Sequence, residues 1–414
     1  MPILGTVRLM LTVAQARERI LAGIQALPPV ELRLQDALGA VLADDVRAPH
    51  ALPRFANSAM DGYAVRSRDI ENASEAHPVV LRLIGEIKAG EGDRLKVEAG
   101  SCARIMTGAP IPIGADAVVP IELARDEGAE VAVLATPPVH GHVRPAGDDV
   151  HSGDLVVRAG SELGAAEIAM LASLGISPVR VRPRPLVAIV VTGDELVDVE
   201  ADLEPGRIRD SNSLALRALV TEAGGDPVPF RTVGDDLEAV TGVLREAAAA
   251  AALVVSAGGV SVGRYDFVKE AVERLGSIDL WRVAMQPGKP VVSGRIGEGP
   301  FLGLPGNPVS VHIGFEQFVR PVLRKMQGRT ELLRPVIPAS LTQPLHKKPG
   351  RLHFVRVALK QGPDGVLATP IGKQGSHIQS SLIGCDGVAR FDIDQTELHP
   401  GDLVDVEVWR VPAG

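Results

Sequence analysis

The sequence has few aromatic residues, few cysteines and no excess of positive charge. Phe, Tyr and Trp together make up 3% of the 414 residues, and the net charge is −8 at pH 7. Nucleic-acid surfaces are rich in basic residues and stacking rings, so we expect no nucleic-acid partner. The cysteines Cys102 and Cys385 lie far apart and in no CxxC pair, which argues against a disulfide framework and a thiolate zinc site.

A long apolar run is also missing. The longest uncharged apolar stretch covers residues 247–255, whereas a membrane-spanning helix needs roughly 20 residues. Arg8 interrupts the apolar N-terminus, and no small-residue cleavage site follows, so we expect no signal peptide. We therefore expect a cytoplasmic protein with no membrane partner.

What the sequence does contain indicates several globular domains. A chain of this length exceeds one ordinary core, and its 44 glycines and 32 prolines are typical of a loop-rich globular protein. Between residues 183 and 329 strand-like and helical patterns alternate. This alternation predicts an α/β/α domain with a mostly parallel sheet covered on both faces, whose ligands bind beyond the carboxyl ends of the strands.

The flanking segments differ in pattern. Short glycine-punctuated runs predict a β-rich inserted domain over residues 50–142, and residues 330–414 predict a small all-β domain. Helical patterns at residues 11–27, 34–40 and 164–175 suggest that residues 1–49 and 143–182 form one discontinuous helical or linker domain. His140 and His142 alternate as on a strand, but without a third ligand we expect no metal there.

A glycine-rich loop follows the strand-like run that starts at Leu253. It extends from Ser256 to Gly263 and reaches Asp266 just before a helical pattern. Such a loop at a helix start can bring backbone N–H groups close to an anion. The alternative is a tight strand-to-helix connection that binds nothing.

Acidic residues recur at the predicted strand-to-helix junctions of the same sheet. They are Glu195, Asp235, Asp236 and Asp266. Each alone is readily explained as a helix N-cap. Together, beside an anion-binding loop, they indicate a cation such as Mg²⁺ shared with substrate phosphates.

Two turns in the inserted domain carry side chains with a possible role in chemistry. Asp61 precedes Gly62, and this pair forms either a turn that presents the carboxylate to a ligand or a plain hairpin turn with a solvated carboxylate. Thr107 precedes Gly108 in a similar turn, where its hydroxyl either meets a ligand or caps the turn.

Several tracts together resemble the MoeA family of molybdopterin molybdenumtransferases, which includes the E domain of gephyrin. The resemblance covers nearly the whole chain. The tracts are NSAMDGYAVR from Asn57, RIMTGAP from Arg104, TGDEL from Thr192, SAGGVSVGRYD from Ser256, PGKP from Pro287, LPGNPVS from Leu304 and GSHI from Gly375.

This resemblance implies a molybdopterin-binding central domain, a C-terminal β-barrel and a specific reaction. Such enzymes hydrolyse the pyrophosphate of adenylylated molybdopterin with Mg²⁺, release AMP and insert molybdenum from molybdate into the dithiolene. The resemblance also implies a homodimer whose active sites are shared between subunits. The adenylyltransferase and recipient molybdoenzymes are the implied partners.

The resemblance assigns roles to residues through the matching motifs. Asp61 and Thr107 of one subunit face the sheet domain of its partner and act with Glu195, Asp235 and Asp266, of which the last three bind Mg²⁺ and pyrophosphate. The residues implied to hold the pterin phosphate region are Ser256, Gly258, Gly259, Ser261, Gly263, Pro305, Gly306, Asn307 and Pro308. Those implied to hold molybdate are Gln286, Lys289, Pro290, Ser310, Arg351 and Ser376.

One departure and two alternatives accompany this hypothesis. Gln286 stands where some relatives have lysine, so the molybdate site has one positive charge fewer.

The first alternative function is adenylylation of molybdopterin, since SAGGVS and LPGNP also occur in the adenylyltransferase. The NSAMDGYAV tract and the C-terminal domain favour the transferase. The second is a non-enzymatic scaffold of the same fold.

Overall fold

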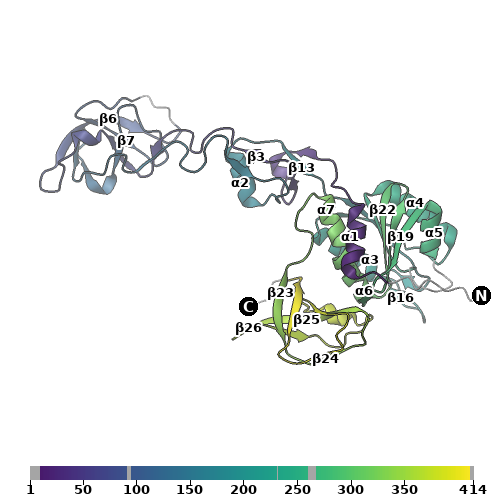
Figure 1. Ribbon diagram of the computed structural model, residues 1–414. Coiled ribbons are helices and arrows are strands. Elements are labelled where there is room, and N and C mark those ends of the chain that lie inside the picture. Colours follow the sequence, from purple (N-terminus) through teal and green to yellow (C-terminus); the bar gives the residue numbers. More distant parts are fainter. Residues whose placement is uncertain (1–9, 91–94, 231, 260–266, 411–414) are drawn as a thin grey trace, which may run out of the picture.

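The computed structural model is elongated, and it describes residues 10–90, 95–230, 232–259 and 267–410. Figure 1 shows the inserted β-rich domain at one end, a small connecting unit with α2 in the middle, and the central sheet with the C-terminal β domain at the other end. None of the helices in these ranges is both long and apolar enough to cross a membrane.

The central unit is built on a six-stranded sheet. The strand order is β17 (Asp226–Pro229), β14 (Leu186–Val191), β18 (Leu253–Ala257), β22 (Gly299–Leu304), β21 (Pro290–Ile296) and β19 (Gly276–Arg282). The first four strands are parallel, and β21 runs antiparallel to both of its neighbours. Strands β14 and β18 are almost entirely apolar and buried because helices cover both faces.

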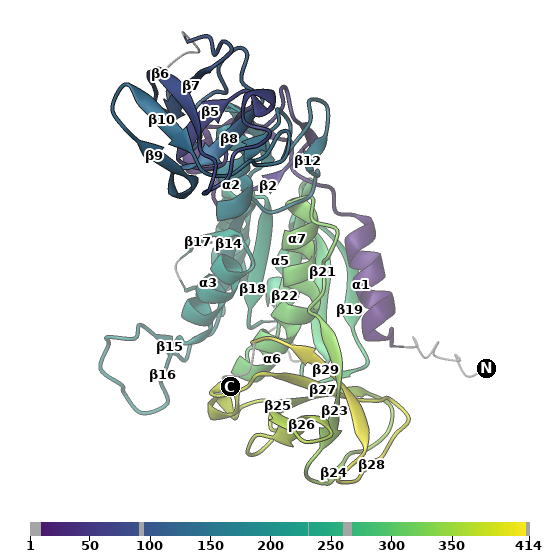
Figure 2. The ribbon, with the colours of Figure 1, turned by 90° about the vertical axis from the view of Figure 1, so that its left-hand side faces the viewer.

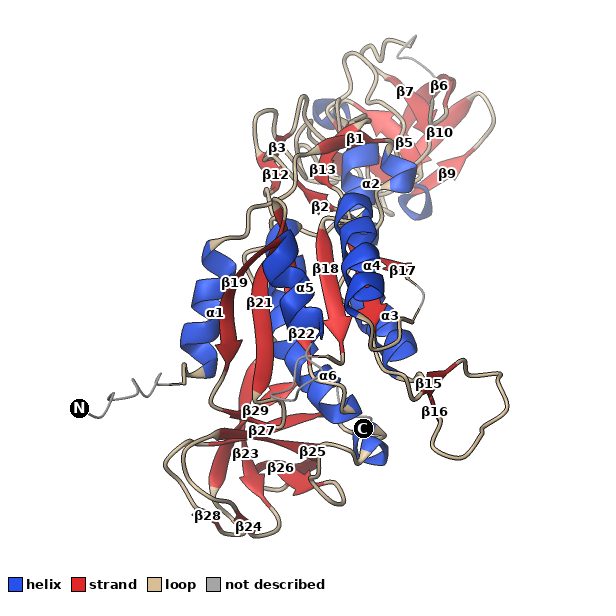
Figure 3. Ribbon diagram, turned by 90° about the vertical axis from the view of Figure 1, so that its right-hand side faces the viewer, coloured by secondary structure: helices blue, strands red, loops and turns tan. Residues whose placement is uncertain are grey.

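Figures 2 and 3 show these helices against the sheet. One face packs against α1 (Val13–Ala22), α3 (Asn212–Glu222), α6 (Pro308–Gly314), the π-helix η4 (Phe315–Val319) and α7 (Arg320–Met326). The other face packs against α4 (Leu237–Ala250) and α5 (Phe267–Leu275). The predicted three-layer α/β/α architecture is therefore confirmed.

The sequence analysis grouped helix α1 with residues 143–182, but the structure places it in the central unit. Its buried face, with Val13, Ala16 and Ile20, joins the core of the central sheet. Its amphipathic pattern shows only that one face is buried. The pattern does not show which element this face packs against, and in the fold α1 lies beside α7.

The C-terminal domain is a closed five-stranded barrel, as the resemblance implied. Strands β25 (Leu352–Gly362), β26 (Gly365–Pro370), β23 (Val336–Leu341), β29 (Leu403–Val408) and β27 (Gly387–Phe391) pair in this order, and β27 pairs back with β25. Strand β20 (Met285–Gln286) of the central unit adds to the barrel alongside β25. This pairing joins the two domains at the level of the backbone. The pair β24 (Leu345–His346) and β28 (Glu397–Leu398) flanks the barrel.

The inserted domain is a second six-stranded sheet. Its order is β8 (Ala117–Pro120), β5 (Gly62–Val65), β7 (Ser101–Ile105), β6 (Val79–Ile87), β10 (Glu130–Val133) and β9 (Ala124–Asp126). Apolar residues of this sheet fall into two separate cores. His140 and His142 have φ of 61° and 57°, so they lie in turns rather than alternating on a strand.

The connecting unit contains α2 (Ala165–Ser173) and three small sheets. These are β1 (Val30–Leu32), β13 (Val179–Arg182) and β2 (Val41–Leu42); β3 (Val46–Arg47) with β12 (Leu155–Val157); and β4 (Asn57–Ser58) with β11 (Val143–Arg144). The expected helix at 34–40 is only the 3-10 turn η1 (Leu34–Asp36), because Gly39 adopts a φ of 74°. The remaining elements are η2 (Ser67–Asp69), η3 (Ile121–Leu123), η5 (Gln379–Leu382), and the paired strands β15 (Leu196–Val197) and β16 (Ile208–Arg209).

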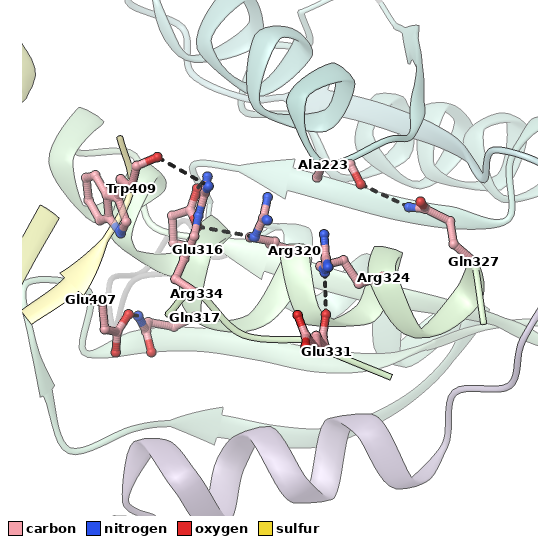
Figure 4. Close-up of polar contacts among 10 residues, drawn as sticks. All are labelled: Ala223, Glu316, Gln317, Arg320, Arg324, Gln327, Glu331, Arg334, Glu407 and Trp409. Atoms are coloured by element: carbon pink, nitrogen blue, oxygen red, sulfur yellow. Dashed lines mark hydrogen bonds and ion pairs between the residues drawn. The ribbon is translucent and has the colours of Figure 1, made fainter. Parts of the chain in front are cut away.

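A buried polar network joins the barrel to the central unit (Figure 4). Arg334, in the connection between α7 and β23, donates from Nε and Nη2 to the two carboxylate oxygens of Glu316 at 2.9 Å each. It also donates to the carbonyl oxygen of Trp409. Gln317 donates to Oε2 of Glu407 in the barrel at 2.6 Å. These bonds fix the orientation of the barrel relative to η4.

Candidate functional site

A cavity of about 910 Å³ lies where the central sheet meets the barrel. The loops that follow β14, β18 and β22 form one side, and the barrel supplies Arg351 and Ser376. This is the carboxyl edge of the parallel strands, where ligands of such sheets bind. In Figure 3 the arrowhead of β18 points towards this side of the sheet.

Most of the residues predicted to form the site line this cavity. They are Glu195, Asp235, Gly258, Gly259, Gln286, Lys289, Pro290, Pro305, Gly306, Asn307, Pro308, Ser310, Arg351 and Ser376. Ser256 is fully buried at the end of β18 and does not line the cavity surface. Ser261, Gly263 and Asp266 lie outside the residues that the structure describes.

The loop after β18 requires its first two glycines. A Cβ atom on Gly258 would come within 2.5 Å of the Thr192 carbonyl oxygen, and one on Gly259 within 2.5 Å of Val268 Cγ2. Both residues also have positive φ. The Gly258 N–H donates to the carbonyl oxygen of Leu304, so this amide does not face a ligand as the sequence suggested.

Two hydroxyl groups beneath this loop are left without a protein partner in the described ranges. Thr192 Oγ1 and Ser256 Oγ are buried, and within the described ranges neither has a hydrogen-bond partner. Thr192 also lines the cavity. Because buried polar groups are normally paired, the Thr192 hydroxyl fits a ligand with oxygen acceptors, whereas the Ser256 hydroxyl lies below the cavity surface.

One acidic residue more than predicted lies beside the acidic part of the cavity, although it does not line the cavity itself. Partial desolvation in the cavity, and then the charges of Asp194 and Glu195, raise the pKa of Asp235, although its side chain stays exposed. Asp194 also accepts a hydrogen bond from the backbone N–H of Asp235 at 2.9 Å. The sequence tract TGDEL contains both Asp194 and Glu195, but the sequence analysis named only Glu195 as the acidic residue at this strand-to-helix junction.

Asp236 has the alternative role considered for each acidic residue. Its carboxylate accepts from the Ala239 N–H at 2.8 Å and caps α4. Among the residues described, no group of three or more His, Cys, Asp or Glu side chains is arranged to hold a metal ion. The raised pKa of Asp235 nevertheless fits a cation, which would offset the mutual repulsion of these carboxylates.

The other part of the cavity is cationic and polar. Lys289 and Arg351 contribute positive charge beside the hydroxyl-bearing Ser310 and Ser376. Asn307 donates to Ser376 Oγ at 3.2 Å and so connects the α/β side of the cavity to the barrel. Planar guanidinium and ammonium groups with hydroxyl donors suit a small oxyanion.

Several lining residues were missed from the sequence. They are Arg209, Ser211, Asn212, Gln374 and His377. Asn212 donates to the Gly306 carbonyl oxygen at 2.7 Å and thereby supports the LPGNP loop. Its position at the start of α3, on the same sheet edge, is the signal that could have indicated it.

Asp61 and Thr107 do not line this cavity, and they contact each other in the inserted domain. The backbone N–H and hydroxyl of Thr107 donate to Asp61 Oδ1 at 2.7 and 2.8 Å. These bonds, the backbone one first, lower the pKa of Asp61 and keep the exposed carboxylate ionised. Figure 1 shows the inserted sheet at the opposite end of the molecule from the barrel.

Comparison with known proteins agrees with this architecture along the chain. Three family models match: the MoeA N-terminal region (domain I and II) over residues 11–175, a probable molybdopterin binding domain over 188–325, and the MoeA C-terminal region (domain IV) over 338–409. The chain belongs to the MoeA family. The resemblance seen in the sequence motifs is thus confirmed.

Relatives in the MoeA family match over almost their full length. Molybdopterin molybdenumtransferase 2 of Mycobacterium tuberculosis is 38% identical over 95% of this chain and 98% of its own. The Haemophilus influenzae molybdopterin molybdenumtransferase is 34% identical over 96% and 98%. Two crystal structures of Pyrococcus horikoshii MoeA proteins, 33% and 29% identical, superpose with TM-scores of 0.85 and 0.81 over 97% of this chain and 100% of theirs.

Membership of the MoeA family has a direct consequence for function. The curated relatives are transferases by name, so the chain is an enzyme of a family that acts in molybdenum cofactor biosynthesis. The site described above is where the chemistry of this family member is to be sought.

Proposed function

We propose that this enzyme transfers molybdenum from molybdate to the dithiolene of adenylylated molybdopterin and releases AMP by Mg²⁺-dependent hydrolysis of the pyrophosphate bond. The observation that supports the proposal is the order of groups along one sheet edge. Glu195 and Asp235 follow β14 and β17, the glycine loop follows β18, LPGNP follows β22, and Lys289 precedes β21. A substrate lying along this edge meets carboxylates at one end and cations at the other.

The acidic end suits pyrophosphate cleavage. Glu195 and Asp235, with Asp266, would hold Mg²⁺, which when bound neutralises charge on the phosphate oxygens. The hydroxyl of Thr192, a residue that lines the cavity, would donate to substrate oxygens near the loop. A carboxylate of this set would orient the attacking water in line with the bond that breaks.

The cationic end suits molybdate, a tetrahedral dianion. Lys289 and Arg351 would donate charge-assisted hydrogen bonds to its oxygens, and Ser310 and Ser376 would add hydroxyl donors. Gln286 would contribute amide donors without charge. The dithiolene of the bound pterin would then lie next to the molybdate. Its sulfur atoms would replace oxygen ligands of the molybdenum.

Asp61 and Thr107 would complete the site from a second subunit. They lie on two exposed turns of the inserted domain that contact each other, outside the cavity of their own chain. A homodimer in which the inserted domain of one subunit reaches the sheet of the other would bring them to the acidic end. The adenylyltransferase that makes the substrate and the molybdoenzymes that receive the product are the expected cytoplasmic partners.

The proposal is tested by following AMP release from adenylylated molybdopterin. Release is expected when both molybdate and Mg²⁺ are present and is expected to stop when either is omitted. Release independent of molybdate would contradict it. Consumption of ATP with molybdopterin would instead favour the adenylyltransferase alternative, and full activity of a folded Asp235→Ala variant would contradict the assigned chemistry.

A further inference from the structure

Arg356 on β25 is a fully buried arginine whose charge has no carboxylate partner among the described residues. Its Nε donates to Ser381 Oγ at 2.9 Å, and its Nη2 donates to the carbonyl oxygens of Lys373 and Gly375 at 3.2 and 3.3 Å. Its Nη1 is buried and, within those same ranges, makes no hydrogen bond. A buried charge of this kind is costly unless something compensates it.

Arg320, shown in Figure 4, provides a contrast. Burial lowers the pKa of each of the two arginines to about 10. Arg320 has the carboxylate of Glu316 at 3.8 Å, and this charge partly offsets the effect of burial. The one described group that raises the pKa of Arg356 is the Cys385 thiol, and burial raises the pKa of that thiol to about 11, so it carries no charge at neutral pH. Both arginines are buried, Arg356 completely and Arg320 with 8% of its surface exposed, and they differ in charge compensation.

The hydrogen bonds of Arg356 all reach one segment, residues 371–381, which forms part of the barrel side of the cavity. Within it Gln374, Gly375, Ser376 and His377 line the cavity. Gln374 is bound to the backbone of Arg356 in both directions, accepting from its N–H at 2.9 Å and donating to its carbonyl oxygen at 3.2 Å. Arg356 therefore fixes the position of this segment through its backbone and its side chain.

The surroundings of Arg356 are also short of negative charge. Burial and then the positive charges of Arg356, Lys347 and Arg351 lower the pKa of His353, on the same strand, to about 4. Both ring nitrogens of His353 are buried without a partner in the described part of the chain. His353 is therefore neutral, and it lies among three cations of which Arg351 lines the cavity.

We propose that Arg356 is a positioning residue for the oxyanion end of the site. It holds the Gly375–Ser376 segment in place and supplies, from behind the cavity wall, a positive charge that the bound dianion compensates. The inference rests on the proposed function, because that function makes molybdate the dianion. It adds a buried charge to Lys289 and Arg351, which line the cavity directly.

The test uses molybdate alone as the probe and measures its dissociation constant by calorimetry on the full chain. Arg356→Met is expected to weaken binding at least about tenfold, the effect of losing a charge-assisted interaction. Arg356→Lys keeps the charge and loses the planar fork, so it is expected to weaken binding less, about threefold. The matched control Arg320→Met removes another buried arginine; it is expected to lower the melting temperature and leave the dissociation constant within about twofold.

The inference is overturned if folded Arg356→Met binds molybdate within about twofold of the unmodified chain. An equal weakening in Arg320→Met, or no molybdate binding by the unmodified chain, overturns it as well. If Arg356→Met does not fold, Arg356→Lys decides, and an unchanged dissociation constant counts against the inference. AMP release by the unmodified chain tests the proposed function separately, because the binding measurement requires no turnover.

Discussion

At the scale of single residues, Asp235 is the group whose titration connects stability with the proposed chemistry. Its pKa is raised, first by partial desolvation and then by Asp194 and Glu195. The folded chain therefore binds a proton at this site more readily than the unfolded chain. The contribution of Asp235 to stability falls as the pH rises from the ordinary aspartate pKa through the raised one.

Asp235→Asn removes this penalty and also removes a proposed Mg²⁺ ligand. At neutral pH without Mg²⁺ we expect the melting temperature to rise slightly, by up to about 2 °C, since the site is partly solvated. AMP release is expected to fall at least about a hundredfold. Calorimetry and the AMP assay check the two effects, and an equal loss of stability and activity would contradict this account.

The pH dependence has a defined sign for the same residue. A proton on Asp235 competes with Mg²⁺, so Mg²⁺ affinity is expected to fall as the pH drops through the raised pKa.

The residues that the sequence analysis missed also belong to the scale of single residues. Asp194 and Asn212 act through hydrogen bonds to Asp235 and Gly306, and the sequence spacing of these pairs does not reveal that they touch.

At the scale of elements, the decisive feature is the junction of η4, the connection after α7, and the barrel. Glu316 has only 4% of its surface exposed and relies on Arg334 for two hydrogen bonds. Arg320 is farther away, at 3.8 Å. Removing one partner of a buried ion pair leaves a charge without adequate compensation.

Arg334→Met is accordingly expected to destabilise the chain by about 3 kcal/mol, lowering the melting temperature by at least about 5 °C. Arg324→Ala is the matched control, since Arg324 donates to the Glu331 carbonyl oxygen in an exposed contact (Figure 4). Thermal unfolding of both variants makes the comparison. Equal melting temperatures would show that the Arg334–Glu316 pair does not hold the barrel in place.

At the scale of the whole molecule, the separation between Asp61 and the cavity of its own chain demands an explanation. The proposed homodimer provides it, because a two-fold interface gives each cavity an Asp61 from the other subunit. Asp61→Ala and Asp235→Ala subunits, each inactive alone, then complement each other. Random mixing is expected to restore about one quarter of wild-type AMP release, since half of the dimers are mixed and each has one intact site.

Unmixed preparations of the two variants serve as controls for that experiment. If Asp61 acts within its own chain, every site in the mixture lacks one essential carboxylate. A mixture that is no more active than its components, with mixed dimers verified by mass, would therefore exclude the shared site.

The central unit was largely predictable from its sequence. Alternating strand and helix patterns gave the layered sheet, and the rule that ligands bind at the carboxyl edge brought Glu195, Asp235, Gly258 and Asn307 to one cavity. These inferences succeed because parallel strands have a fixed direction. The barrel residues Arg351 and Ser376 followed from family resemblance, since no local pattern connects them to a sheet edge in another domain.

The sequence by itself determined most of the strands and helices, which faces are apolar and which family the motifs indicate, because these depend on local periodicity and residue chemistry. Only the tertiary structure decided that α1 packs on the central sheet, that Asp194 raises the pKa of Asp235 and that Arg356 lies buried without a carboxylate. Charge compensation and packing partners depend on distances between residues far apart in the chain, and these distances exist only once the chain has folded.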